Sequence, residues 1–102
     1  MPAADQTERK KPLVEQRIAA FNQSPFARLL KMTVTEAHDG YARVIMDCGH
    51  TLNPHDVAHG GAIFGLADQA FGIAANCGGI DRVAVSVHIQ YIAPATGSLV
   101  AI

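Results

Sequence analysis

An aspartate in the middle of an apolar stretch is the residue of this sequence that most directly suggests chemistry. In the stretch HGGAIFGLADQAFGIAAN, residues 59–76, every position from 62 to 75 is apolar or glycine except Asp68 and Gln69. A buried carboxylate costs several kcal/mol unless it is paired, hydrogen-bonded or neutralised. We therefore expect Asp68 to be buried and to be kept for its chemistry.

Small residues surround this carboxylate on the expected helix. At helical spacing, Gly61, Gly65, Asp68 and Gly72 share one face with Ala75. A glycine in a helix interior costs up to about 1 kcal/mol relative to alanine, so its use here needs a reason. Two explanations stay open: a ligand approaches the backbone closely, or the face packs tightly against another helix or strand.

The start of the same helix suggests a second chemical group. His59, Gly60 and Gly61 place unobstructed backbone N–H groups at the positive end of a helix dipole, where an oxyanion is stabilised. Gly60 and Asp68 are eight positions apart, which is roughly 12 Å along a helix axis. One small reacting group cannot contact both on one chain. If both are catalytic, we expect at least a dimer in which the acid of one subunit faces the helix start of another.

A metal site is the competing interpretation of the histidines in this region. His55 and His59 have the i, i+4 spacing of zinc-protease helices. Pro54 before them and the glycine pair after them favour a turn that enters a helix. No third ligand is clearly spaced for the site, although Cys48 and His50 are near. We therefore expect neither a metal nor another cofactor.

Local patterns predict the elements that position these residues. Pro12 is expected to open a short amphipathic helix, and Ser24-Pro25 to cap a second one. Alternating residues on both sides of Asp39-Gly40 predict a hairpin whose return strand is residues 41–47. A central, buried helix is expected from Gly60 or Gly61 to Asn76. Residues 82–92 predict a long strand with an apolar and a polar face, and residues 98–102 the start of another.

Composition limits the class of protein and its partners. The chain has 102 residues, 49% of them hydrophobic, and a net charge of −1, as expected for one small globular domain. No basic cluster beyond Arg9, Lys10 and Lys11 supports binding to nucleic acid or to a membrane surface. The two cysteines, Cys48 and Cys77, favour a reducing, cytoplasmic location over a disulfide framework. Neither a signal peptide nor a membrane span is expected.

The predicted sheet is thin for so apolar a helix. Three strands and the start of a fourth precede the end of the sequence at Ile102. We expect that another chain completes the layer or that the domain is a shortened one. The predicted organisation is a flexible segment, residues 1–11, followed by one domain, residues 12–102.

Four motifs together resemble a known family. SPFARLL, GYARVIMD, LNPHDVAHGGAIFGLADQAFGIAAN and YIAPATG are similar to segments of the hotdog-fold acyl-CoA thioesterases of the phenylacetate-degradation, or PaaI-like, type. The resemblance runs from about Ser24 to the end of the chain. It implies an α+β fold in which a curved antiparallel sheet wraps around one long helix. It also implies dimers or tetramers that hydrolyse acyl- or aryl-acyl-CoA without a metal.

The resemblance also implies roles for individual residues. Asp68 matches the catalytic carboxylate, which acts as a nucleophile or as the base for water. Gly60 matches the residue whose backbone N–H polarises the thioester carbonyl, and His59 and Asn53 match polar groups that line the pocket. Ser86 is near the position of a hydroxyl that helps to hold water, although a small strand residue is an equally good explanation. The neighbouring glycines that we expect to line the substrate are Gly61 and Gly65.

Length is the main departure from the family pattern. Its members continue beyond SLVAI with strands that complete the sheet and contribute to CoA binding, and we expect these C-terminal strands to be missing here. This favours an alternative function, a non-catalytic or degenerate hotdog module that only binds an acyl group or assembles. A hotdog dehydratase ranks lower, because its sequence setting of catalytic histidine and acid is not found.

Overall fold

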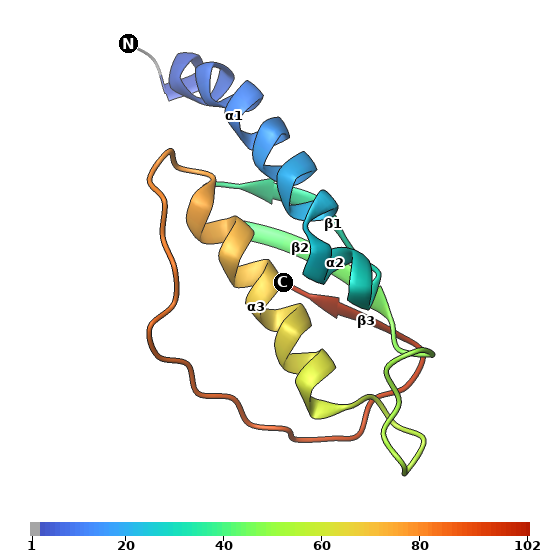
Figure 1. Ribbon diagram of the computed structural model, residues 1–102. Helices are drawn as coiled ribbons and strands as arrows, with labels where there is room; N and C mark the ends of the chain where they lie inside the picture. The colour runs from blue at the N-terminus through green and yellow to red at the C-terminus, as the bar shows by residue number, and fades with distance from the viewer. Residues whose placement is uncertain (1–2) are drawn as a thin grey trace.

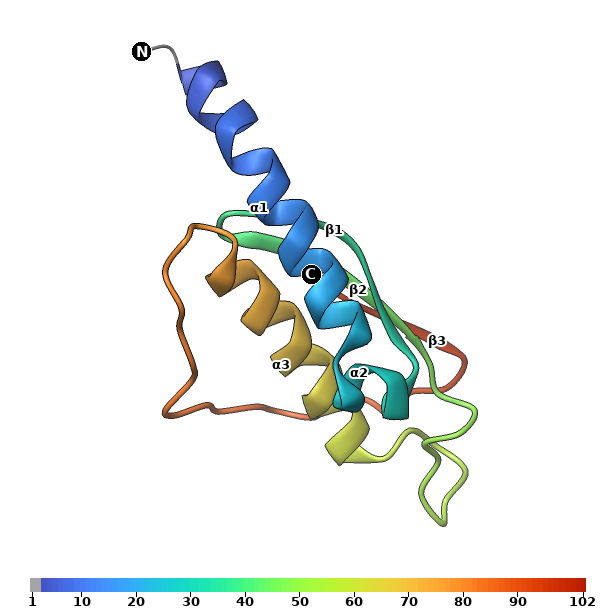
Figure 2. The ribbon, with the colours of Figure 1, turned by 45° about the horizontal axis from the view of Figure 1, so that its top comes forward.

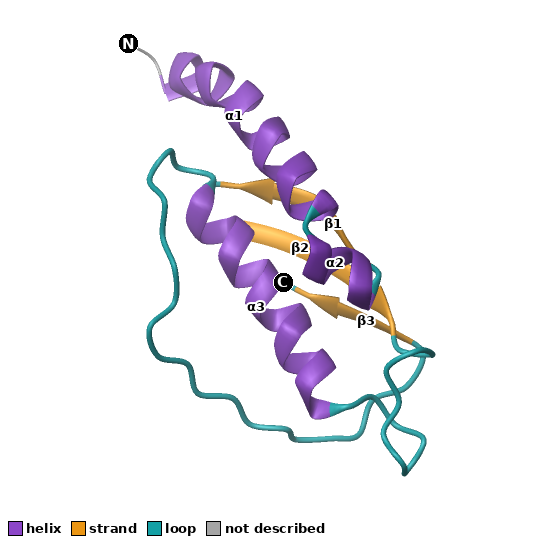
Figure 3. Ribbon diagram, in the orientation of Figure 1, coloured by secondary structure: helices purple, strands orange, loops and turns teal. Residues whose placement is uncertain are grey.

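The computed structural model describes residues 3–102 and contains one sheet with helices on one of its faces (Figures 1 and 3). The α3 helix lies across β2, while α1 and α2 lie along β1 (Figures 1 and 2). The elements in chain order are α1 (Ala3–Gln23), α2 (Pro25–Leu30), β1 (Met32–His38), β2 (Tyr41–Asp47), α3 (Gly60–Asn76) and β3 (Ser98–Ala101).

The hairpin that the sequence predicts forms the first two strands. β1 and β2 pair antiparallel from Met32↔Met46 to His38↔Tyr41, with a register shift between Val34 and Glu36. Gly40 has a φ of 80°, a left-handed conformation that glycine adopts without strain. Along β2 every second residue is buried, because alternate side chains of a strand point to opposite faces of the sheet.

The central helix forms with the predicted bounds, but it is buried on one side only and not nearly all round as predicted. α3 buries one side against the inner face of the sheet, where Ile73 and Val44 are completely buried. Removing apolar surface from water stabilises the fold by roughly 25 cal/mol per Å². This packed face fixes the direction of α3 and therefore the positions of the polar residues on its other sides. The buried core consists of Ala27, Met32, Val34, Ala42, Val44, Met46, Cys48, Ala58, Ala62, Leu66, Ala70, Ile73 and Cys77.

The prediction of a paired strand at residues 82–92 is wrong for the chain as described. The sheet has the order β1-β2-β3, and residues 82–92 run outside it as an extended segment without strand pairing (Figure 3). A strand needs a neighbour that accepts and donates its backbone hydrogen bonds, and within residues 3–102 none lies beside this segment. We call residues 80–97 the extended segment. Strand β3, by contrast, forms as predicted because β2 supplies its partner edge.

The extended segment is anchored near both of its ends. At its start, the Asn76 side chain accepts a hydrogen bond from the Arg82 N–H at 2.8 Å and donates one to the Arg82 carbonyl at 3.0 Å. Arg17 of α1 forms an ion pair with Asp81 at 2.8 Å. At its other end, the Ala58 N–H donates to the Ala95 carbonyl at 2.8 Å. The segment therefore spans the α3 side of the fold between two fixed points.

The first helix is longer than the sequence predicts. α1 begins at Ala3 and contains Pro12 in its interior, although residues 1–11 are predicted to be flexible; Met1 and Pro2 lie outside the described residues. Alanine, glutamate, lysine and arginine in this stretch favour a helix. Within the described chain, none of the helices combines the length and the apolarity needed to cross a bilayer.

Candidate active site

The first turn of α3 uses most of its backbone donors and leaves one of them without a partner. His59 is the N-cap, and its Nδ1 accepts a hydrogen bond from the Gly61 N–H at 2.9 Å. The N–H groups of Ala62 and Ile63 donate to the His59 carbonyl at 2.9 and 3.1 Å. Among residues 3–102, no acceptor is within hydrogen-bonding reach of the Gly60 N–H. That N–H is the donor available to a ligand oxygen at the positive end of the helix.

The same hydrogen bond defines the state of the histidine ring. Because Nδ1 of His59 accepts from Gly61, a neutral ring carries its proton on Nε2. The side chain is exposed, so this Nε2–H can donate to a ligand. His59 therefore orders the turn with one nitrogen and offers a second donor with the other.

Tyr91 lies against Gly60, a contact that the sequence does not predict. Its hydroxyl donates to the Gly60 carbonyl at 3.0 Å. A Cβ added at Gly60 would meet the ring carbon Cζ at 3.3 Å, a tight contact that a small shift of the tyrosine ring would relieve. The sequence pattern places Tyr91 only on the apolar face of a strand. The sequence carries no local signal for this contact, which depends on the path of the extended segment across the fold.

Asn53 and Gly60 line one cavity of about 280 Å³, together with Tyr91 and the following residues 92–94. The Asn53 side-chain oxygen accepts from the N–H of His55 at 2.8 Å and more weakly from that of Val57 at 3.4 Å. This oxygen therefore holds the loop before α3. Within the described residues the NH₂ group of Asn53 makes no hydrogen bond, which leaves it as a second donor for this cavity.

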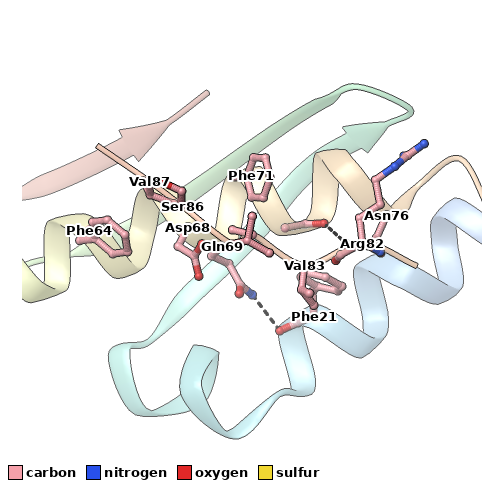
Figure 4. Close-up of a pocket in the computed structure, with 13 residues that line it drawn as sticks. Phe21, Phe64, Asp68, Gln69, Phe71, Asn76, Arg82, Val83, Ser86 and Val87 are labelled. Atoms are coloured by element: carbon pink, nitrogen blue, oxygen red, sulfur yellow. Dashed lines mark hydrogen bonds between the residues drawn. The ribbon is translucent and has the colours of Figure 1, made fainter. Parts of the chain in front are cut away.

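Asp68 and Ser86 line a different cavity, of about 610 Å³, between α3 and the extended segment (Figure 4). Its other walls include the rings of Phe64 and Phe71, and an adjoining space of about 530 Å³ shares these walls and extends to Ile89. Beside the acid, the side-chain amide of Gln69 donates to the Phe21 carbonyl at 3.0 Å and so connects α3 to α1. The larger space thus has polar walls at Gln69, Asn76 and Arg82 as well, whereas the adjoining one is mostly apolar, and Ser86 supplies the hydroxyl of both linings.

Asp68 is not buried in the single chain, contrary to the prediction from the sequence. The side chain is exposed, because the cavity that it lines between α3 and the extended segment is open to water. Burial of the acid would require the apolar helix to be covered on all sides. In the described chain the sheet covers one side only, and the acid is on a side that the chain leaves accessible to water.

The predicted site residues fall into two groups. Asp68 and Ser86 share one cavity, while Asn53 and Gly60 share the other. His59 and Gly61 lie at the turn beside the second group. In one chain the acid and the Gly60 N–H line different cavities. This agrees with their separation of eight positions along the helix.

The glycine face of α3 is explained at two positions by helix packing. A Cβ at Gly65 would meet Leu30 Cδ1 and the Phe26 ring at 3.0 Å, and one at Gly72 would meet the Phe21 ring at 3.1 Å. Close approach is therefore made by the side chains of α1 and α2. Gly65 is buried on the side that packs against α2 and does not line the cavity of Asp68. This placement gives no support to the predicted contact between Gly65 and the substrate.

The histidine pair does not adopt the helical arrangement of a zinc protease. His55 lies in a turn closed by the hydrogen bond from the Asn53 N–H to the Val57 carbonyl at 2.8 Å, and His59 precedes the helix. Within residues 3–102, no three histidine, cysteine, aspartate or glutamate side chains cluster as metal ligands would. Cys48 and Cys77 are free, buried thiols, and burial raises the pKa of both.

Comparisons with known proteins identify the family of this chain. Residues 55–102 match the family model described as the thioesterase superfamily. The chain is 36% identical over 88 residues to a putative esterase of Archaeoglobus fulgidus, covering 84% of this chain and 57% of the relative. It is 34% identical over 77 residues to the acyl-coenzyme A thioesterase PaaI of Escherichia coli, covering 74% and 55%. The chain thus spans about half the length of the curated relatives it matches.

Solved structures support the same assignment. The E. coli PaaI protein from the phenylacetic acid degradation operon aligns with a TM-score of 0.78 and 31% identity, over 85% of this chain and 66% of that one. A mutant of the phenylacetic acid degradation protein PaaI from Thermus thermophilus aligns with a TM-score of 0.68 and 33% identity, over 76% and 67%. This chain belongs to the thioesterase superfamily and is a PaaI-like member of it with the hotdog fold.

Proposed function

We propose that this protein hydrolyses the thioester of acyl-CoA or aryl-acyl-CoA. The observation that carries the proposal is the Gly60 N–H at the start of α3, which has no acceptor in the described part of the chain, on the same helix as an aspartate that lines a cavity. An N–H at a helix N-terminus stabilises negative charge that develops on a carbonyl oxygen. A carboxylate supplies the nucleophile or the base that the same reaction needs. The relationship to an acyl-CoA thioesterase supports this pairing.

The reaction divides between the two groups. The thioester carbonyl oxygen accepts a hydrogen bond from the Gly60 N–H, so negative charge can move to that oxygen as the carbonyl carbon is attacked. In one route Asp68 takes a proton from the attacking water, the carbon–sulfur bond then breaks, and the CoA thiolate takes up that proton. In the other route Asp68 attacks the carbon itself, the carbon–sulfur bond breaks as the mixed anhydride forms, and water then hydrolyses the anhydride and supplies the proton of the thiol. Asn53 and His59 orient the carbonyl from the helix start, and Ser86 holds the water beside Asp68.

Two chains are needed to assemble this site. Gly60 and Asp68 line different cavities of one chain, so we assign the acid to one subunit and the N–H to its partner across a two-fold axis. The extended segment supports this assignment, because its backbone has no strand partner among residues 3–102 and Val83 and Val85 are almost fully exposed. A second copy of the chain that pairs with this segment would cover these valines, in a dimer or in a tetramer of dimers.

Substitution of the acid tests the chemistry. Asp68→Asn keeps the shape of the side chain and removes its charge, so kcat for thiol release from a panel of acyl-CoAs should fall by about 100-fold or more. Asp47→Asn is the matched control: Asp47 lies on β2 and accepts a hydrogen bond from the Gly49 N–H, which asparagine can also accept. Undiminished thiol release by Asp68→Asn would refute the role of the acid.

A mixture of two inactive variants tests whether the site is shared. Gly60→Pro removes the N–H at a helix position that tolerates proline, and the extended backbone of His59 suits the residue before proline. In a dimer of Asp68→Asn with Gly60→Pro, one of the two shared sites is intact. Random mixing should restore about a quarter of the activity. A site contained in one chain would show no recovery.

A second candidate function is a hotdog module that binds acyl groups without hydrolysing them. The exposure of Asp68 in the described chain favours it, because a site that is open to water does not hold an acid and a thioester in a fixed arrangement for the reaction. Heat released on titration with an acyl-CoA, together with no thiol release at any protein concentration, would select this function over hydrolysis.

A further inference from the structure

We propose that Tyr91 is a positioning residue that fixes the Gly60 N–H for the reaction; the inference rests on the proposed thioesterase function. Tyr91 contacts Gly60 in two ways. Its hydroxyl donates to the Gly60 carbonyl at 3.0 Å, and its ring carbon Cζ lies 3.3 Å from the position that a Cβ of that residue would take.

Gly60 needs such a restraint because of its place in the chain. A glycine has more backbone freedom than any other residue, and the first turn of a helix lacks half of its hydrogen bonds. Two consecutive glycines begin α3. Without further contacts, the direction of the Gly60 N–H would vary, and a donor that wanders from the oxyanion position loses most of its effect.

The peptide group between Gly60 and Gly61 is held at both of its polar atoms. Tyr91 donates to its carbonyl oxygen, and Nδ1 of His59 accepts from its N–H at 2.9 Å. The ring of Tyr91 lies against the Gly60 backbone on one side. With the following peptide fixed and the ring in contact, rotation about the Gly60 backbone is restricted, and so is the direction of its own N–H.

The tyrosine is itself held by its neighbours in the chain. Four residues further on, the Ala95 carbonyl accepts from the Ala58 N–H at 2.8 Å, immediately before the turn that His59 begins. The ring also forms a wall of the cavity that contains Asn53 and Gly60. Tyr91 thus connects the extended segment to the start of α3 at the point where the thioester carbonyl would bind.

Kinetics of matched tyrosine variants test the role. Tyr91→Phe removes the hydroxyl and keeps the ring, and should lower kcat by about threefold to tenfold; Tyr91→Ala removes both and should lower it by up to about 100-fold. KM should stay within about twofold in Tyr91→Phe, since the donor acts mainly on the transition state. Tyr41→Phe is the control: its hydroxyl bonds to Glu36 in the hairpin, away from both cavities, and kcat should not change.

Amide NMR of the same variants tests the contact without relying on turnover. In Tyr91→Phe the Gly60 and Gly61 amide resonances should shift, whereas those of Gly65 and Gly72, which pack against α2 and α1, should stay in place. Unshifted Gly60 and Gly61 resonances, or an unchanged kcat in Tyr91→Phe, would overturn the role of Tyr91 and leave the thioesterase proposal standing. No thiol release by the unsubstituted protein would overturn both.

Discussion

Residues 32–76 and the extended segment are both rich in apolar side chains, and they differ in what covers those side chains. In the first region Ile73 is 0% exposed, because α3 packs on the sheet. In the second, Val85 is 97% and Ile92 is 91% exposed. Hydrophobic patterning thus identifies residues that need burial, but it does not say whether their partners are in the same chain.

The candidate site lies at the border between these two regions. Gly60 and Asp68 belong to the packed helix, whereas Ser86 and Tyr91 belong to the extended segment. A rigid helix gives the chemical groups fixed positions, and a segment with unpaired backbone can accept a second chain. This division of roles leads to predictions that separate the two regions experimentally.

A matched pair of isoleucine substitutions should show the largest difference. Ile73→Ala opens a cavity in the core and should lower the free energy of unfolding by about 3 to 4 kcal/mol. Ile92→Ala removes a side chain that water already surrounds. In dilute protein this substitution should lower the free energy of unfolding by less than about 0.5 kcal/mol. Urea unfolding of both variants beside the unsubstituted protein measures the two values.

The dependence of stability on protein concentration tests whether a second copy covers the extended segment. If a second copy covers the extended segment, the cost of Ile92→Ala should rise with protein concentration, because association then contributes to stability. The cost of Ile73→Ala should stay constant. An Ile92→Ala cost equal to that of Ile73→Ala in dilute, dissociated protein would show that the segment packs within its own chain.

Asn76 connects the two regions, and its loss should have the next largest effect. Its buried side chain donates to the Gly72 carbonyl and pairs with the backbone of Arg82. Asn76→Ala should lower the free energy of unfolding by about 2 kcal/mol, because it removes the hydrogen bonds of a buried side chain and leaves the N–H and carbonyl of Arg82 without these partners. It should also speed trypsin cleavage after Arg82, since it releases the start of the extended segment.

Asn22 provides the control for this substitution. Its side chain makes a similar pair of hydrogen bonds, to the N–H of Val34 at 2.7 Å and to the carbonyl of Val34 at 3.4 Å, but inside the packed region. Asn22→Ala should lower stability without faster cleavage after Arg82. Equal cleavage rates in the two variants would mean that Asn76 does not anchor the segment.

The sequence predicts the elements whose signals are local. Asp39-Gly40 between alternating residues indicates the hairpin, Ser24-Pro25 indicates the start of α2, and the uninterrupted apolar run indicates α3. Each depends on neighbours within a few positions. The strand predicted at residues 82–92 has the same local pattern, but its pairing depends on a partner strand that lies elsewhere.

The sequence predicts the chemical groups of the site but not their surroundings. The available N–H of Gly60 and the cap made by His59 follow from a histidine and two glycines at a helix start. The exposure of Asp68 and the contact of Tyr91 with Gly60 depend on the path of the extended segment across the fold. No spacing within the sequence encodes that path.

Alkaline pH should produce the smallest effect, and only in the packed region. Burial is the main cause that raises the pKa of the Cys48 and Cys77 thiols above 9.0, with smaller contributions from Asp47 and Asp39 respectively. A thiol with a raised pKa in the folded state contributes its full stability below the unfolded pKa, near 9, and loses it as the pH rises further. Urea unfolding at about pH 8 and about pH 10.5 should therefore show a decline that is shallower in the Cys48→Ala, Cys77→Ala double variant. The extended segment contains no cysteine, so an equal decline in both proteins would place the alkaline sensitivity outside these buried thiols.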